Sequence, residues 1–292
     1  MVRKRGGRLR RRRRRLKAVA VVPSMFTLGN LLCGFAAVYY AAKPFAAEDQ
    51  SKSLLIAGIL VFVGMFFDSV DGYVARLTRS VSELGGQLDS LADIVTFGVA
   101  PAYMTLQLVT RYYLGGDAEQ TVISPLHDDV FGRIFWVCAA IYVACTALRL
   151  ARFNVETASG VLDDHMYFRG LPAPGAGGCV AGLILLHEHY YEALNQFQWV
   201  ARTTGLGMTF ILLLCAVAMV SRLPYVHIVN KYLRRKASFG FLVEVAIVLV
   251  CAAIFMVEAI ALSFTAYALS APLRSVWVGW RRRARAIRSR SA

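Results

Sequence analysis

Four aspartates interrupt an otherwise apolar part of this 292-residue chain, and their spacing could assemble a metal site. They are Asp68, Asp71, Asp89 and Asp93. The first two are three residues apart and the last two are four apart, and on a helix both intervals place side chains on one face. Two neighbouring helices could therefore turn two carboxylates each toward a common point. Carboxylate ligands in that number suit Mg²⁺, Mn²⁺ or Ca²⁺ better than zinc.

Such a site could bind a phosphate group. A charged carboxylate in mid-membrane costs roughly 2.5–3.5 kcal/mol, and one or two divalent cations would offset this cost and bind phosphate well. Gly72 and Gly85 carry no side chain, so a ligand could approach closely there. Arg76 could pair with a phosphate or with an aspartate. The alternative is an ion-paired membrane boundary, which explains one Asp–Arg pair but not four carboxylates beside two glycines.

The complete stretch from Asp68 to Asp93 reads D-x2-D-G-x2-A-R-x8-G-x3-D-x3-D. This pattern resembles the signature of the CDP-alcohol phosphatidyltransferases. The resemblance implies a transmembrane enzyme, usually a homodimer, that moves a phosphatidyl group from a CDP-linked lipid to an alcohol and releases CMP. It also implies that the aspartates bind Mg²⁺ or Mn²⁺, with two ions per site as one possibility, and that Asp93 is the general base. By the same resemblance, four other fixed residues contact the CDP-linked lipid: Gly72, Ala75, Arg76 and Gly85.

Three further stretches bear on the acceptor alcohol. GGQLDSLADIVTFGVAPA, ALRLARFN (147–154) and RGLPAPGAGG (169–178) resemble membrane-bound bacterial members of the family that use L-serine. Members that make phosphatidylglycerophosphate typically have a proline directly after the third aspartate, where this chain has Ser90. The resemblance covers roughly residues 20–270. It predicts CDP-diacylglycerol and L-serine as substrates, with inositol, glycerol phosphate or choline as alternative acceptors.

Basic and polar residues near the end of the fourth predicted span could bind the acceptor. A guanidinium is a natural partner for a carboxylate or a diphosphate, and Arg149 and Arg152 end this span on the side predicted for the aspartates. Arg169 precedes the next span. These arginines either contact a ligand or only anchor helices at the lipid headgroups, and Asn154 is either a ligand contact or a helix C-cap. The sequence His-Glu-His at 187–189 resembles a metal pair, but we expect a surface loop there, on the opposite side.

The composition excludes an ordinary soluble domain and indicates a membrane protein. Hydrophobic residues make up 57% of the chain, and its net charge of +15 is concentrated at the two ends. Basic residues that flank membrane spans mark the cytoplasmic side and attract anionic lipids. We therefore expect residues 1–17 and 271–292 to be basic cytoplasmic tails rather than nucleic-acid-binding segments. The six cysteines lie in apolar runs without a CxxC pair, which favours small buried side chains over disulfides or zinc ligands.

The predicted fold is all-α, a polytopic transmembrane bundle of about eight spans over residues 18–270, with the six-helix core that the family resemblance implies. The expected spans are 28–42, 54–76, 85–109, 134–150, 172–186, 205–220 and two short helices within 239–269 that turn near 256–258. An even number of spans places both tails and the aspartates on the cytoplasmic side of what we expect to be a bacterial inner membrane. An ion-coupled transporter is a remote alternative, since its carboxylates would be spread through the midplane.

The first predicted span contains a polar residue that needs a partner. Asn30 lies in the apolar segment FTLGNLLCGF, and we expect it to face the aspartate site. Gly29 and Gly34 in the same segment predict close packing of this helix against its neighbours, because small residues let helix backbones approach.

Overall fold

The computed structural model describes residues 24–43, 50–78, 83–113, 123, 125–126, 129–158, 167–226 and 255–288. The predicted basic arm at 1–17 and Cys251 lie outside these residues. So does the first of the two short helices expected within 239–269, apart from its last residue. The described helices, in chain order, are Ser24–Ala41, α2 (Gln50–Thr78), α3 (Glu83–Asp93), η1 (Ile94–Val99), α4 (Ala100–Tyr113), α5 (Val130–Ala158), α6 (Ala173–His189), α7 (Tyr191–Asn195), α8 (Gln198–Val220) and α11 (Met256–Arg288). Two three-residue strands, β1 (Tyr167–Arg169) and β2 (Pro224–Val226), pair antiparallel.

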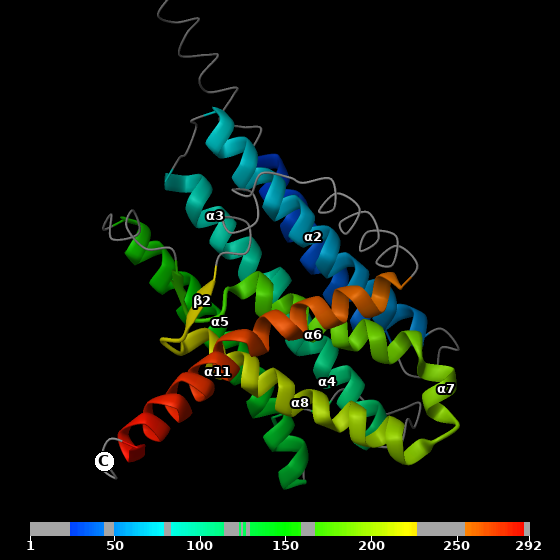
Figure 1. Ribbon diagram of the computed structural model, residues 1–292. Helices are drawn as coiled ribbons and strands as arrows, with labels where there is room; N and C mark the ends of the chain where they lie inside the picture. The colour runs from blue at the N-terminus through cyan, green and yellow to red at the C-terminus, as the bar shows by residue number, and fades with distance from the viewer. Residues whose placement is uncertain are drawn as a thin grey trace, which may run out of the picture.

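Six helices of the described chain are long and apolar enough to cross a membrane. They are Ser24–Ala41, Lys52–Val74, Leu84–Tyr113, Val130–Glu156, Trp199–Val220 and Met256–Ser275. The 17-residue α6 is shorter than these six, is largely buried, and packs between α2 and α11 (Figure 1). The prediction of an all-helical, polytopic membrane protein is confirmed.

The third span contains an irregularity that the apolar pattern does not reveal. The sequence predicts one regular helix over 85–109, but α3 passes into the π-helix η1 directly after Asp93, and α4 continues the span. A π segment changes the rotation of the residues that follow it, and such segments often occur at functional sites. The fully buried Tyr142 donates a 2.9 Å hydrogen bond to the carbonyl of Phe97 within η1, which ties α5 to this segment.

The first helix, α2 and η1 approach one another closely at small residues. A Cβ on Gly34 would lie 2.4 Å from Oγ1 of Thr96, and a Cβ on Gly64 would lie 2.7 Å from Cγ2 of the same threonine. Both distances are too short for a side chain, so these positions require glycine. The predicted close packing of the first span is confirmed, with Thr96 filling the space between the helices.

The C-terminal helix is longer than predicted. Its start agrees with the expected turn near residues 256–258, but α11 continues beyond 269, through Pro272, to Arg288. Most of the segment expected to be a basic tail is therefore helical. Its apolar half packs on α6, and its end lies away from the bundle (Figure 1).

Candidate active site

Three of the four aspartates meet at one end of the bundle. The last turns of α2 carry Asp68 and Asp71, and α3 carries Asp89 and Asp93. Figure 1 shows the end of α2 beside the start of α3. Carboxylate oxygens of Asp68, Asp71 and Asp89 all lie within 4.8 Å of one another. The helix spacing therefore does bring carboxylates from two segments to a common point, as the sequence predicts.

This cluster has the donor set and the electrostatic need for a divalent cation. Two carboxylates at this distance repel each other by about 3 kcal/mol at an effective dielectric constant near 20. Oδ1 of Asp89 is buried and has no hydrogen-bond partner among the described residues. A cation would remove the repulsion and satisfy that oxygen. Carboxylate oxygens in this number fit Mg²⁺ or Mn²⁺, so the residues present are consistent with the metal that the sequence predicts.

Asp93 lies one helical turn beyond the cluster and has its own partner. The residue is 6% exposed, and Nδ2 of Asn30 donates a 3.0 Å hydrogen bond to its Oδ1. Asn30 is completely buried. The prediction that Asn30 has its partner beside the aspartates is confirmed. The first helix thus positions Asp93, which lies outside the group of three clustered carboxylates.

The first helix also contacts the cluster through a residue that the sequence analysis did not single out. Oγ1 of Thr27 donates a 2.8 Å hydrogen bond to Oδ2 of Asp71, and Oγ1 of Thr96 donates a 3.0 Å bond to the backbone carbonyl of Asn30. Thr27 lies three residues before Asn30 and so shares its helix face. This spacing could have identified Thr27 from the sequence, because two polar residues on one face of an apolar span need polar partners.

Gly72 gives the cluster an open side. A Cβ on Gly72 would meet nothing within 4 Å among the described residues, so there is room for a ligand beside Asp71. Gly85 lies in α3, four residues before Asp89. The side chains of Ala75 and Arg76 lie outside the described part of the structure, although α2 continues through both positions. Their predicted contact with a CDP-linked lipid therefore stays a prediction.

The acceptor candidates occupy different surroundings. Asn154 at the end of α5 donates a 2.9 Å hydrogen bond from Nδ2 to Oγ of Ser90, which follows Asp89. Arg152 pairs with Glu156 at 2.8 Å on its own helix. Arg149 is 5% exposed and lies over the ring of Phe153 at 5.6 Å. The backbone of Arg169 is in β1, but its side chain is not described. The contact made by Asn154 places the end of α5 against the aspartate helix.

The prediction of a surface loop at 187–189 is wrong. His187 and Glu188 are buried at the end of α6, and Nη1 of Arg111 donates to both carboxylate oxygens of Glu188 at 2.9 and 3.0 Å. Nδ1 of His187 lies 3.2 Å from the same carboxylate. Figure 1 shows α7, which follows this segment, at the far end of the bundle from the start of α3. An ion pair in the interior explains these charged residues without a second metal site.

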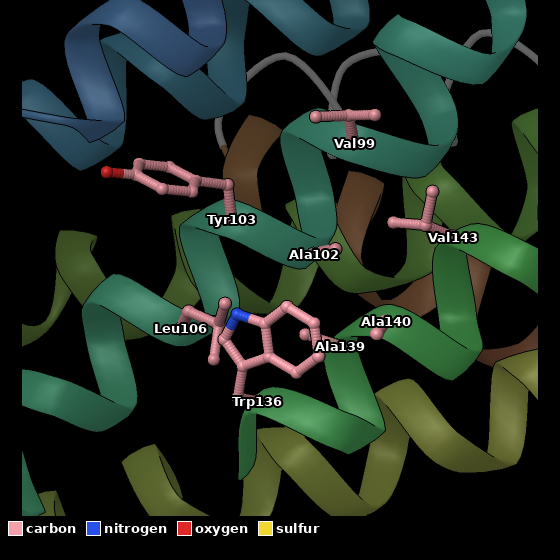
Figure 2. A pocket seen from close by; sticks show the side chains of 8 residues that line it. All are labelled: Val99, Ala102, Tyr103, Leu106, Trp136, Ala139, Ala140 and Val143. Atoms are coloured by element: carbon pink, nitrogen blue, oxygen red, sulfur yellow. The ribbon is translucent and has the colours of Figure 1, made fainter. Parts of the chain in front are cut away.

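Two apolar cavities lie away from the aspartates. One, of about 160 Å³, is lined by η1, α4 and α5, and Figure 2 shows side chains from both sides of it, including Leu106 and Trp136. The other, of about 450 Å³, lies between α6, α8 and α11. No carboxylate lines either one, so neither is the reaction site. Their linings suit hydrocarbon.

Comparison with known proteins agrees with the site. The family model of the CDP-alcohol phosphatidyltransferases matches residues 20–220, which include all four aspartates, α6 and the whole of α8. This chain belongs to that family, and it is an integral membrane protein. Helix α11 lies beyond the matched part.

Several similar proteins share the name CDP-diacylglycerol–serine O-phosphatidyltransferase. The protein of that name from Helicobacter pylori is 34% identical over 203 residues, which cover 70% of each chain. The one from Bacillus subtilis is 33% identical over 208 residues, covering 70% of this chain and 90% of the relative. The one from Methanocaldococcus jannaschii is 30% identical over 175 residues, covering 60% of this chain and 66% of the relative.

Proposed function

We propose that this protein transfers the phosphatidyl group of CDP-diacylglycerol to the hydroxyl of L-serine, giving phosphatidylserine and CMP. The observation that carries the proposal is the meeting of Asp68, Asp71 and Asp89 within 4.8 Å, at the positions that the family signature fixes. The choice of serine rests on the relatives from Helicobacter pylori and Bacillus subtilis, whose names state that acceptor.

The clustered carboxylates are proposed to hold one divalent ion, Mg²⁺ or Mn²⁺, through Asp68, Asp71 and Asp89. A second ion would share Asp93. The chemistry supplied by such ions, when bound, is neutralisation of the charge that develops on the diphosphate of the lipid. The open side at Gly72 leaves room for the CDP moiety. The other proposed contacts of this moiety are Ala75, Arg76 and Gly85.

Asp93 is the proposed general base. The serine hydroxyl oxygen attacks the lipid-side phosphorus, the bond from that phosphorus to the oxygen of CMP breaks, and the hydroxyl proton passes to the carboxylate of Asp93. In-line geometry lets this occur as a single displacement without an enzyme-bound intermediate. The low exposure of Asp93 supports the role, because exclusion of water limits competing hydrolysis.

The end of α5 is the proposed acceptor side of the site. Asn154 donates a hydrogen bond to Ser90, which directly follows the proposed metal ligand Asp89, and the buried Arg149 lies five residues earlier on the same helix. We assign the carboxylate of serine to this region, with Arg152 and Arg169 as further candidates.

We also propose a homodimer in which the aspartates and both basic ends face the cytoplasm, where nucleotides are available. The +15 net charge would then gather the anionic lipid substrate at the correct surface.

The test is CMP release by the purified protein in detergent, with CDP-diacylglycerol and Mn²⁺ or Mg²⁺. L-serine, inositol, glycerol 3-phosphate and choline are supplied in turn. We expect release with serine alone, and Asn154→Ala should raise the KM for serine more than that for the lipid. Release with another alcohol would keep the family chemistry but refute serine. No release with any of them, from folded protein, would refute the proposed activity.

A further inference from the structure

We propose that the first helix supplies two positioning residues with separate tasks: Thr27 orients the metal-binding carboxylate of Asp71, and Asn30 orients the base Asp93. This inference rests on the proposed function, because it assigns one contact to the metal site and the other to proton transfer. Neither Thr27 nor Asn30 belongs to the signature stretch from Asp68 to Asp93.

The geometry separates the two contacts. Thr27 donates at 2.8 Å to Oδ2 of Asp71, and Asp71 belongs to the group of carboxylates that lie within 4.8 Å of one another. Asn30 donates at 3.0 Å to Oδ1 of Asp93, which is not in that group. The two donors are three residues apart, so one face of the helix reaches both sites.

The direction of the Asn30 amide follows from its surroundings. An ionised carboxylate only accepts hydrogen bonds, so the amide nitrogen must face Asp93. The amide oxygen is buried with no conventional partner among the described residues, and it lies against Gly64 of α2, where a Cβ would be 2.9 Å away. The reversed amide would place two acceptors against each other. One rotamer of Asn30 is therefore preferred, and it holds Asp93 in one orientation.

The backbone of the first helix is fixed as well. Thr96 of η1 donates to the carbonyl of Asn30 at 3.0 Å and packs where Gly34 and Gly64 have no side chains. Asp93 directly precedes η1, which contains Thr96. The segment that carries the proposed base therefore also fixes the position of Asn30, the residue that orients this base. Such supporting contacts matter because an error of about 1 Å in a reacting group can reduce turnover about 100-fold.

The two tasks predict different losses. Mutation of a residue that orients a metal ligand typically lowers the metal affinity about 10- to 100-fold. Thr27→Val, which keeps the shape and removes the hydroxyl, should raise the Mn²⁺ dissociation constant about tenfold. Its CMP release should recover when Mn²⁺ is raised to saturation, and Thr27→Ser should behave like the parent. Asn30→Leu should lower kcat about 10- to 100-fold at saturating Mn²⁺, with a smaller change in Mn²⁺ affinity.

The experiment measures Mn²⁺ binding by electron paramagnetic resonance titration, and kcat and the KM for each substrate at saturating Mn²⁺. It uses the full-length parent, Thr27→Val, Thr27→Ser and Asn30→Leu, with unfolding temperatures to establish folding. Thr105→Val is the control, since Thr105 is a buried threonine that bonds to the carbonyl of Pro101 on its own helix. It should match the parent in both assays.

The expected result is a loss of Mn²⁺ affinity in Thr27→Val that saturating Mn²⁺ overcomes, and a loss of turnover in Asn30→Leu that saturating Mn²⁺ does not restore. Losses of the same kind in both variants, parental behaviour in both, or a Thr27→Ser variant as impaired as Thr27→Val would overturn the inference. If the parent releases no CMP with any alcohol, the proposed function fails instead. The Mn²⁺ titration then still decides whether Thr27 supports a metal site.

Discussion

The hydroxyl of Tyr225 donates a 2.9 Å hydrogen bond to the backbone carbonyl of Ala268. Within a regular α11, this carbonyl would accept from the N–H group four residues later, but that residue is Pro272, which has none. The strand β2 therefore satisfies the group that the proline leaves open, and the hydroxyl responsible belongs to a fully buried side chain. This contact explains how α11 continues through the proline.

Tyr225→Phe should lower the free energy of unfolding by about 1 kcal/mol, because the carbonyl of the buried Ala268 loses its donor while the packing stays. The measurement is the unfolding transition in detergent. Tyr39→Phe, at a residue 61% exposed on the first helix, is the matched control and should change nothing. Equal stability of the two variants would show that the bond contributes nothing measurable.

Metal removal should both stop turnover and destabilise the protein. A ligand that binds only the folded state adds about 2.7 kcal/mol when present at 100 times its dissociation constant. Mn²⁺ added to chelator-treated protein should therefore raise the unfolding temperature and restore CMP release. In Asp68→Asn, Mn²⁺ should give a much smaller rise. An undiminished rise in that variant would place the ion elsewhere.

Asp93→Asn should reduce kcat at least about 100-fold, since proton transfer by a positioned base contributes about 10²–10⁴-fold. Asparagine keeps the size of the side chain but accepts a proton poorly, so binding of CDP-diacylglycerol should be nearly unchanged. Both quantities can be followed, by CMP release and by equilibrium binding of the lipid in detergent. Full activity of the variant would refute the assignment of the base.

Gly64→Ala should damage both stability and turnover. The added methyl group would lie 2.7 Å from Cγ2 of Thr96 and 2.9 Å from Oδ1 of Asn30. Overpacking of this kind typically costs about 1–3 kcal/mol, and here it also displaces the residue that holds Asp93. The matched control is Gly207→Ala on α8, where a Cβ would meet nothing within 4 Å among the described residues. The control should be as stable and active as the parent, and equal effects would contradict the packing argument.

Asp129 should stabilise the protein only when it is ionised. The hydroxyl of Tyr113 and the backbone N–H groups of residues 130–132, at the start of α5, hold the pKa of this carboxyl below its usual range. A lowered pKa in the folded state means that the contribution is present above the ordinary carboxyl pKa of about 4 and is lost as pH falls toward the folded-state value. Asp129→Asn should unfold at a lower temperature than the parent at pH 7. The difference should shrink with increasing acidity, and a difference independent of pH would contradict the charge-based explanation.

Much of this protein follows from sequence alone. The apolar runs predict membrane helices, because backbone polar groups in lipid must bond within their own segment. The i, i+3 and i, i+4 spacings predict that the four aspartates on α2 and α3 face a common point, and Asp68, Asp71 and Asp89 do so, whereas Asp93 lies outside their group. Asn30 was also predictable as a site residue, since an amide in an apolar span needs a partner.

Tertiary structure decided the features that depend on contacts between distant segments. The pattern of residues 187–189 indicates a polar loop, but the ion pair between Arg111 and Glu188 lets α6 continue through it in the interior. Tyr225 likewise lets α11 continue past Pro272. In both cases, a polar group that would end an isolated helix forms an ion pair or a hydrogen bond with a residue more than 40 positions away in the sequence. Spacing along one helix reveals which residues share a face, and only the folded chain shows which partner each of them finds.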